Sequence, residues 1–197
     1  NLTSIDQTSD SCTNNFATWN PLAKNSTVTL DNGNARAVFT ASGTWNFVFS
    51  TIGASSGKYY YEVKVATVGT ESTIGIMEMD TAINEQGTAD NVGKNVESVG
   101  YQSNGRIRKN NSEVQTGLTS LSNGDILGIA MDLDNNTVQF YLNGSSQGSA
   151  VSIASDKVYA FATSGYGSSE HQTNFGNPTF SISSGNSDGN GYGNFEY

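Results

Sequence analysis

The sequence predicts an all-β protein, an antiparallel two-sheet β-sandwich with very little helix. Strand-like windows recur roughly every dozen residues along the chain. Asn-Gly pairs and other turn-forming residues separate most of these windows, and no window shows the long 3.6-residue apolar period of an amphipathic helix. Many short strands joined by such turns are typical of sandwiches, and a length of 197 residues suits one domain.

The expected strands follow one another at short intervals. They are residues 27–30, 35–40, 44–50, 58–66, 73–77, 98–102, 106–109, 126–133, 138–142, 158–163 and 171–175. The longest segment without a strand pattern is 78–97. A loop of that length is usually functional or mobile, and the alternative is an irregular surface excursion with one helical turn near 81–85.

Residues 124–144 give the clearest pattern. The window 126–133 is apolar on both faces apart from Asp132, and Val138, Phe140 and Leu142 alternate with more polar side chains. The residues between these windows tolerate the backbone conformation of tight turns. We therefore expect a hairpin, with Asp132 and its neighbours in a structural turn rather than as calcium ligands, because the spacing of a helix-loop-helix calcium site is absent.

This hairpin resembles the signature hairpin of the SPRY family. Four other segments resemble landmarks of that family in the expected order: 56–65, 73–76, 99–105 and 173–176. The resemblance implies a SPRY-like, concanavalin-A-like sandwich over residues 14–182 that serves in binding. Residues 1–13 would be an N-terminal arm, and the Gly/Asn/Ser-rich segment 183–197 either follows the sandwich or supplies its closing strand.

A narrower resemblance rests on the runs 5–22, 30–34, 175–178 and 189–197. These are similar to SPRY-type segments in structural proteins of tailed bacteriophages. The resemblance implies a non-enzymatic binding domain of a fibre, spike or decoration protein on the extracellular virion surface. Two kinds of partner stay open: a host-surface glycan, or other virion proteins including a second copy of the chain, without glycan binding.

Composition excludes several other classes of protein. Acidic residues outnumber basic ones by 18 to 9, which gives a net charge of −9 and repels nucleic acid. No apolar run reaches the roughly 18 residues that a membrane-spanning helix needs, so no membrane insertion is expected. Cys12 is the single cysteine and cannot form an internal disulfide, which predicts a small half-buried side chain or a free thiol.

The sequence predicts no catalytic residues, cofactor or metal. Glu78 and Asp80 invite comparison with the carboxylate strand of laminarinase-like glycoside hydrolases. The third carboxylate should stand at position 82 or 83, but Ala82 and Ile83 occupy these positions. The two acids are therefore interpreted as solvated loop charges. The solitary His171 rules out a two-histidine zinc site and is expected at a strand edge.

Six residues are candidates for ligand binding. Arg106 and Arg108 point the same way on a strand and, with Lys109, could hold an acidic sugar or carboxylate; the alternative is exposed charge that discourages edge pairing. Tyr166, flanked by glycines, is the aromatic residue expected to be exposed and able to stack on a sugar. Glu78 and Asp80 complete the set.

Other aromatic residues near expected loop tips are Trp19, Trp45, Tyr101 and Tyr192. Trp45 is expected in the core because it precedes Phe47 and Phe49 at alternating positions. The resemblance places binding in variable loops at one rim, here 78–97, 106–111 and 165–170, but none of these loops matches a family motif closely enough to transfer a contact residue.

Overall fold

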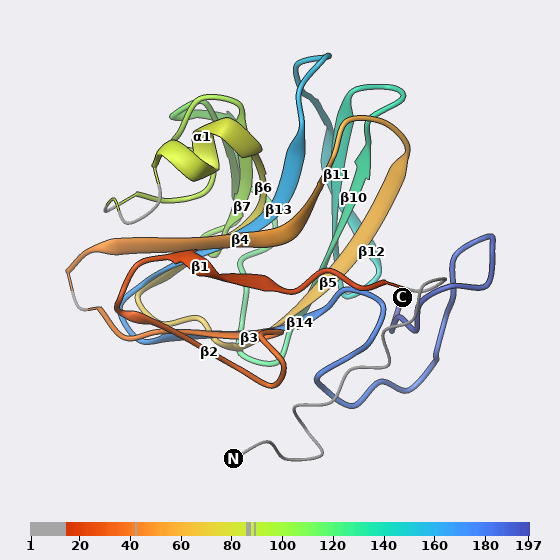
Figure 1. The fold of residues 1–197 in the computed structure, drawn as a ribbon, viewed down its shortest axis with the longest axis horizontal. Helices are drawn as coiled ribbons and strands as arrows, with labels where there is room; N and C mark the ends of the chain where they lie inside the picture. The colour runs from red at the N-terminus through yellow and green to blue at the C-terminus, as the bar shows by residue number, and fades with distance from the viewer. Residues whose placement is uncertain (1–14, 42, 86–87, 89) are drawn as a thin grey trace.

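A computed structural model describes residues 15–197 except 42, 86, 87 and 89, so the expected arm 1–13 and Cys12 lie outside the described residues. Two seven-stranded antiparallel sheets pack face to face (Figure 1). The first sheet has the order β1 (Trp19–Lys24), β4 (Trp45–Ala54), β13 (Tyr159–Tyr166), β6 (Glu71–Glu78), β7 (Ser98–Gln102), β8 (Arg106–Lys109) and β9 (Ser112–Gln115).

The second sheet has the order β12 (Ser145–Ser152), β11 (Thr137–Leu142), β10 (Ile126–Asp132), β5 (Lys58–Thr67), β14 (Ser169–Asn174), β3 (Arg36–Phe39) and β2 (Val28–Asp31). A single short helix, α1 (Met79–Asn84), occurs in the described part of the chain. The predicted fold class, an all-β sandwich with very little helix, is confirmed. No helix of the described residues is long and apolar enough to cross a membrane.

The main core lies between the two sheets, and strand alternation fills it. In β5 the side chains of Tyr61, Val63 and Val65 are fully buried in this core. Tyr61 sits at its centre, with its ring centroid 4.1 Å from that of Phe161 and 5.5 Å from that of Phe175. Such aromatic contacts stabilise a core beyond the area that they bury. The alternate residues of β5 face the outer side of the second sheet.

The predicted hairpin is present as β10 and β11. Ile129 pairs with Phe140, and Asp132 pairs with Thr137, across the antiparallel ladder. At the turn, the Asp132 carboxylate accepts the backbone N–H of Asn135 at 3.0 Å. The side chain of Asp132 thus has the structural role in the turn that the sequence indicates.

Several expectations for single residues are wrong. Trp19 and Tyr101 are fully buried core residues rather than loop-tip aromatics. His171 is not at an edge, because β14 lies between β5 and β3. Its buried ring contacts the hydroxyls of Thr163 at 2.6 Å and Ser72 at 2.9 Å. Burial lowers the pKa of His171 to about 3, so the ring is neutral at physiological pH.

Candidate binding surface

The outer face of the first sheet carries a second, smaller apolar cluster. Phe47, Phe49 and Met77 of the sheet pack there with Ala82 of α1 and Val92 of the following loop. Figure 1 shows α1 beside the ends of β6 and β7. The described residues of 79–97 therefore form a cover packed on the sheet, and the helical turn expected near 81–85 is present as α1.

Gly100 lets this cover approach the sheet closely, and Gly75 lets the neighbouring strands β6 and β7 lie close together. A Cβ atom on Gly100 would lie 2.7 Å from the carbonyl oxygen of Val92, and one on Gly75 would lie 2.0 Å from that of Val99. Side chains at these positions would therefore displace the backbone of β7 or of the loop. The sequence signal for this packing is the absence of a side chain at both positions.

The interpretation of Glu78 as a solvated loop charge is wrong. Its side chain is buried at the end of β6, and its carboxylate accepts the backbone N–H of Thr81 at 2.8 Å, which caps α1. Burial disfavours the charged form, but the hydrogen bonds from Thr81 outweigh it and the pKa of Glu78 is lowered. Asp80 is exposed in the first turn of α1. Because the strand ends at Glu78, the two carboxylates do not line one strand as a hydrolase pair would.

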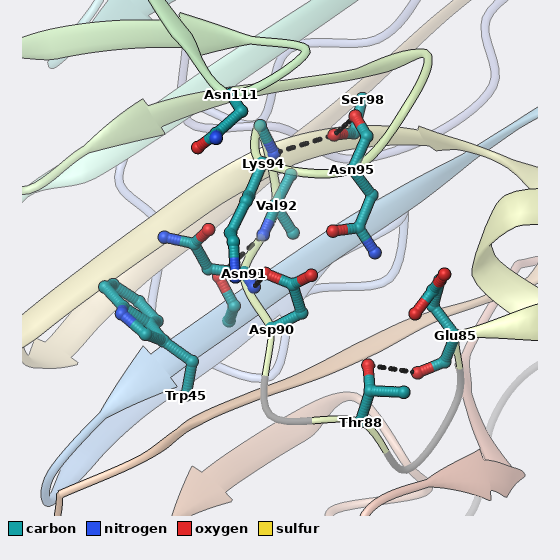
Figure 2. A network of polar contacts seen from close by, with 12 residues as sticks. Trp45, Glu85, Thr88, Asp90, Asn91, Val92, Lys94, Asn95, Ser98 and Asn111 are labelled. Carbon is teal, nitrogen blue, oxygen red and sulfur yellow. Dashed lines mark hydrogen bonds and ion pairs between the residues drawn. The ribbon is translucent and has the colours of Figure 1, made fainter.

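Polar contacts hold the loop that follows α1 (Figure 2). Lys94 forms an ion pair with Asp90 at 3.1 Å. The Ser98 hydroxyl donates to the carbonyl of Asn95 at 2.5 Å and accepts the N–H of Gly93 at 3.0 Å. These contacts hold the described residues of the loop against the first sheet. The loop therefore forms an ordered rim at the outer face of this sheet.

Trp45 and Tyr166 form an aromatic pair at the same rim. They are paired residues on β4 and β13, and their ring centroids lie 5.6 Å apart at an interplanar angle of 53°. Both side chains are only half-buried, so the expectation that Trp45 belongs to the core is wrong. The N–H of Val92 donates to the Ser164 hydroxyl at 3.2 Å, which places the loop two residues from Tyr166 along β13.

The three cations of β8 all have partners within the chain. Arg106 pairs with Glu113, and the Arg108 guanidinium donates to the Asn111 side chain at 2.8 Å. Lys109 donates to the carbonyl of Ser152 at 2.8 Å. Arg106 and Arg108 lie opposite the buried Ile107, as alternation predicts, but their guanidinium groups are engaged separately. The structure brings Tyr166 together with Trp45 and leaves Arg106, Arg108 and Lys109 as a separate group.

The model of the SPRY domain family matches residues 58–178, more than half of the chain. The chain belongs to the SPRY domain family. SPRY domains are typically protein-binding modules and are generally non-catalytic. Strands β1 to β4 lie outside the matched region, yet they complete both sheets of this domain.

Solved structures share the fold at low sequence identity. The SPRY domain of human HERC1 is 17% identical, with a TM-score of 0.61 over 79% of this chain and 96% of that chain. The TRIM65 PSpry domain is 15% identical, with a TM-score of 0.62 over 80% and 91% of the two chains. Stonustoxin is 19% identical, with a TM-score of 0.61 over 80% of this chain and 27% of its own. A search of the curated proteins gives no match.

Proposed function

We propose that this SPRY domain is a non-enzymatic binding domain of a tailed-phage structural protein, a fibre, spike or decoration protein on the virion surface, and that it contacts host-surface glycan. The observation that carries the glycan proposal is the half-exposed pair of Trp45 and Tyr166. Sugar rings present apolar C–H faces, and adjacent aromatic rings at a rim are suited to stack against them.

The chemistry around the pair favours a neutral glycan over an acidic one. Lys94, the cation of the adjacent loop, is bound to Asp90, and the β8 arginines are engaged by Glu113 and Asn111. The net charge of −9 also repels acidic polysaccharide. Binding would therefore rest on stacking and on neutral hydrogen bonds rather than on ion pairs.

The test is a glycan array probed with the full chain and with Tyr166→Ala. A stacked ring contributes about 1 kcal/mol or more, so Tyr166→Ala should weaken binding of the selected glycan by about fivefold or more. Arg106→Gln is the matched control, since its partner is Glu113, and should leave affinity within about twofold. Absence of any bound glycan, or equal affinity of Tyr166→Ala and the parent, contradicts the proposal.

The second candidate function is assembly with other virion proteins or with a second copy, without glycan binding. Exposed apolar side chains near α1 favour it: Ile83, Val96 and Val158 are 47%, 68% and 42% exposed. The N–H of Met79 donates to the carbonyl of Val158 at 2.8 Å, and the N–H of Glu78 donates to that of Glu97 at 3.0 Å. These bonds bring Val158 and the neighbour of Val96 to the start of α1. Exposed apolar side chains that gather in one place mark protein interfaces.

Sedimentation velocity over a range of concentrations tests self-assembly. Val96→Asp should abolish concentration-dependent association, because it places a charge in the buried contact, whereas Val114→Asp on the edge strand β9 should not. A monomer at every concentration contradicts self-association. If Val96→Asp still binds glycan, the host contact lies at the Trp45–Tyr166 pair, which we call the Trp45 rim, and not at the apolar residues near α1.

A further inference from the structure

A groove with a volume of about 470 Å³ lies on the side of the second sheet, between its strands β5 and β10 and the C-terminal segment 183–197. Figure 1 shows this segment far from α1, across the sandwich. Three tyrosines line it, Tyr59, Tyr60 and Tyr192, together with Lys58, Asp132 and Asp188. We call it the tyrosine groove. Its volume lies in the range of small-molecule binding sites.

The wall made by the C-terminal segment is fixed to the sheet by a buried carboxylate. Glu62 is 0% exposed, and its oxygens accept the backbone N–H groups of Glu196 at 3.0 Å and Tyr197 at 2.9 Å. Phe195 is buried against Tyr60, with ring centroids 5.1 Å apart in an edge-on arrangement. The wall is therefore a packed part of the domain.

A second carboxylate positions the tyrosine of that wall. Asp188 accepts the backbone N–H of Asn190 at 2.9 Å and that of Tyr192 at 2.8 Å, which fixes the turn carrying Tyr192. Tyr192 and Tyr59 nevertheless remain 51% and 43% exposed. Two large, partly exposed aromatic side chains thus line the same groove, and the backbone that carries one of them, Tyr192, is fixed by Asp188.

Small residues of β10 lie beside the groove. Ala130 lines it, and a Cβ atom on Gly128 would lie 2.3 Å from the Tyr60 hydroxyl. Glycine at position 128 thus leaves room for Tyr60 to lie across β10.

The charges that line the groove nearly cancel. Lys58 forms an ion pair with Asp132 at 2.9 Å, and Asp188 adds one further carboxylate. One cation against two carboxylates does not suit phosphate, sulfate or an acidic sugar. Fixed donors and acceptors beside open aromatic rings suit a ligand that has an apolar face and several hydroxyls.

We infer that the tyrosine groove is a binding site for a neutral saccharide unit, with its C–H face on Tyr59 or Tyr192 and its hydroxyls toward Lys58, Asp132 and Asp188. This site is separate from the Trp45 rim, which lies on the first sheet. The inference goes beyond the proposed function, since the domain would hold a glycan at two places or hold one there alone.

The three methionines of the chain provide the test. Met131 lines the tyrosine groove, whereas Met77 and Met79 belong to the cluster on the outer face of the first sheet. The full chain, labelled with ¹³C in the methionine methyl groups, is titrated with the methyl glycosides of glucose, galactose and N-acetylglucosamine. We expect a saturable shift of the Met131 signal with at least one glycoside and constant signals from Met77 and Met79.

Three variants identify the contact. Tyr192→Ala should weaken the glycoside response by about fivefold or more, whereas Tyr192→Phe, which keeps the ring, should stay within about twofold. Tyr59→Ala supplies an independent second variant. Tyr192 is exposed on a surface turn, and thermal unfolding verifies that each variant is folded.

The inference is overturned if no glycoside shifts Met131, or if folded Tyr192→Ala and Tyr59→Ala bind as the parent does. A Met131 response to choline in place of the glycosides also overturns it, because that would assign the aromatic rings to a cation. Rim binding is measured separately with Tyr166→Ala on the glycan array. Either proposal can therefore fail without the other.

Discussion

The backbone N–H of Tyr197 donates a 2.9 Å hydrogen bond to the buried carboxylate of Glu62, 135 positions earlier in the chain. The other donors to this carboxylate are the N–H of Glu196 and the side chains of Asn174 and Tyr60, at 3.0, 3.1 and 3.3 Å. A buried carboxylate is costly unless such donors surround it. The last residues of the chain therefore supply part of what stabilises Glu62 in the middle of β5.

The first prediction concerns this carboxylate. Glu62→Ala should lower the free energy of unfolding by about 3 kcal/mol, because it leaves buried donors without their charged acceptor. It should also speed proteolytic cleavage within 183–197. Urea denaturation and timed proteolysis with mass spectrometry measure the two effects. Glu113→Ala, a change in an exposed carboxylate, is the control, and a Glu62→Ala protein that matches it in both assays would refute this role.

The second prediction concerns the main core. Phe140 is fully buried opposite Ile129, so Phe140→Ala should destabilise the domain by about 3–5 kcal/mol through the cavity that it leaves. Val114→Ala, on the exposed edge strand β9, should change stability by no more than about 0.5 kcal/mol. Denaturant midpoints decide the matter. An unchanged midpoint in Phe140→Ala would mean that the register of β11 is wrong.

The third prediction is a pH dependence that arises from His171. Its pKa is about 3 in the folded protein and about 6.5 when unfolded, so between these values the unfolded chain binds a proton that the folded chain does not. This contribution to stability is complete above about pH 6.5. It falls as the pH is lowered toward 3, by at most about 1.4 kcal/mol per pH unit.

His171→Asn removes the titrating group and should flatten that part of the curve. The carboxylates titrate in both proteins, including Glu170, the charged group that acts on His171, so the difference between the two curves isolates the histidine. Denaturation is measured at several values from pH 7 to pH 4. Parallel curves for the two proteins would exclude the predicted protonation.

The fourth prediction separates a structural from a catalytic role of Glu78. Glu78→Gln should cost about 1 kcal/mol because it weakens the cap of α1, while the exposed Asp80→Asn should change stability by about 0.5 kcal/mol or less. The parent and both variants are incubated with host polysaccharide and assayed for new reducing ends, and none are expected. Cleavage by the parent that disappears in Glu78→Gln would show that the domain is an enzyme.

The sequence is sufficient for the fold class because most strands alternate clearly or follow Asn-Gly turns. It does not show β1, β9 and β12. β1 includes Pro21 and the exposed Leu22, while β9 and β12 are largely exposed, so burial imposes no period on any of them. All three lie at sheet edges, where one side of the strand has no partner and the side chains are free to be polar.

The site is harder to predict from the sequence than the fold, because its side chains come from distant parts of the chain. The sequence suggests Tyr166 through its flanking glycines, but its neighbour Trp45 comes from a strand more than a hundred residues earlier. The tyrosine groove joins Tyr59 to Tyr192 in the same way. Glu78 caps α1, but glutamate is not among the residues that favour the N-cap, so its role could not be predicted from the local sequence.

The strand order of the first sheet determines how early this sheet can be completed while the chain is being synthesised. β13 lies between β4 and β6, so these two strands have no common neighbour until Tyr166 has left the ribosome. At typical rates of translation, the interval between the ends of β6 and β13 is roughly 4 to 18 s. Throughout it, one backbone edge of β4 and one of β6 lack the strand with which they pair. We therefore expect the nascent chain to need chaperone protection and to acquire resistance to protease only after its last strands are made.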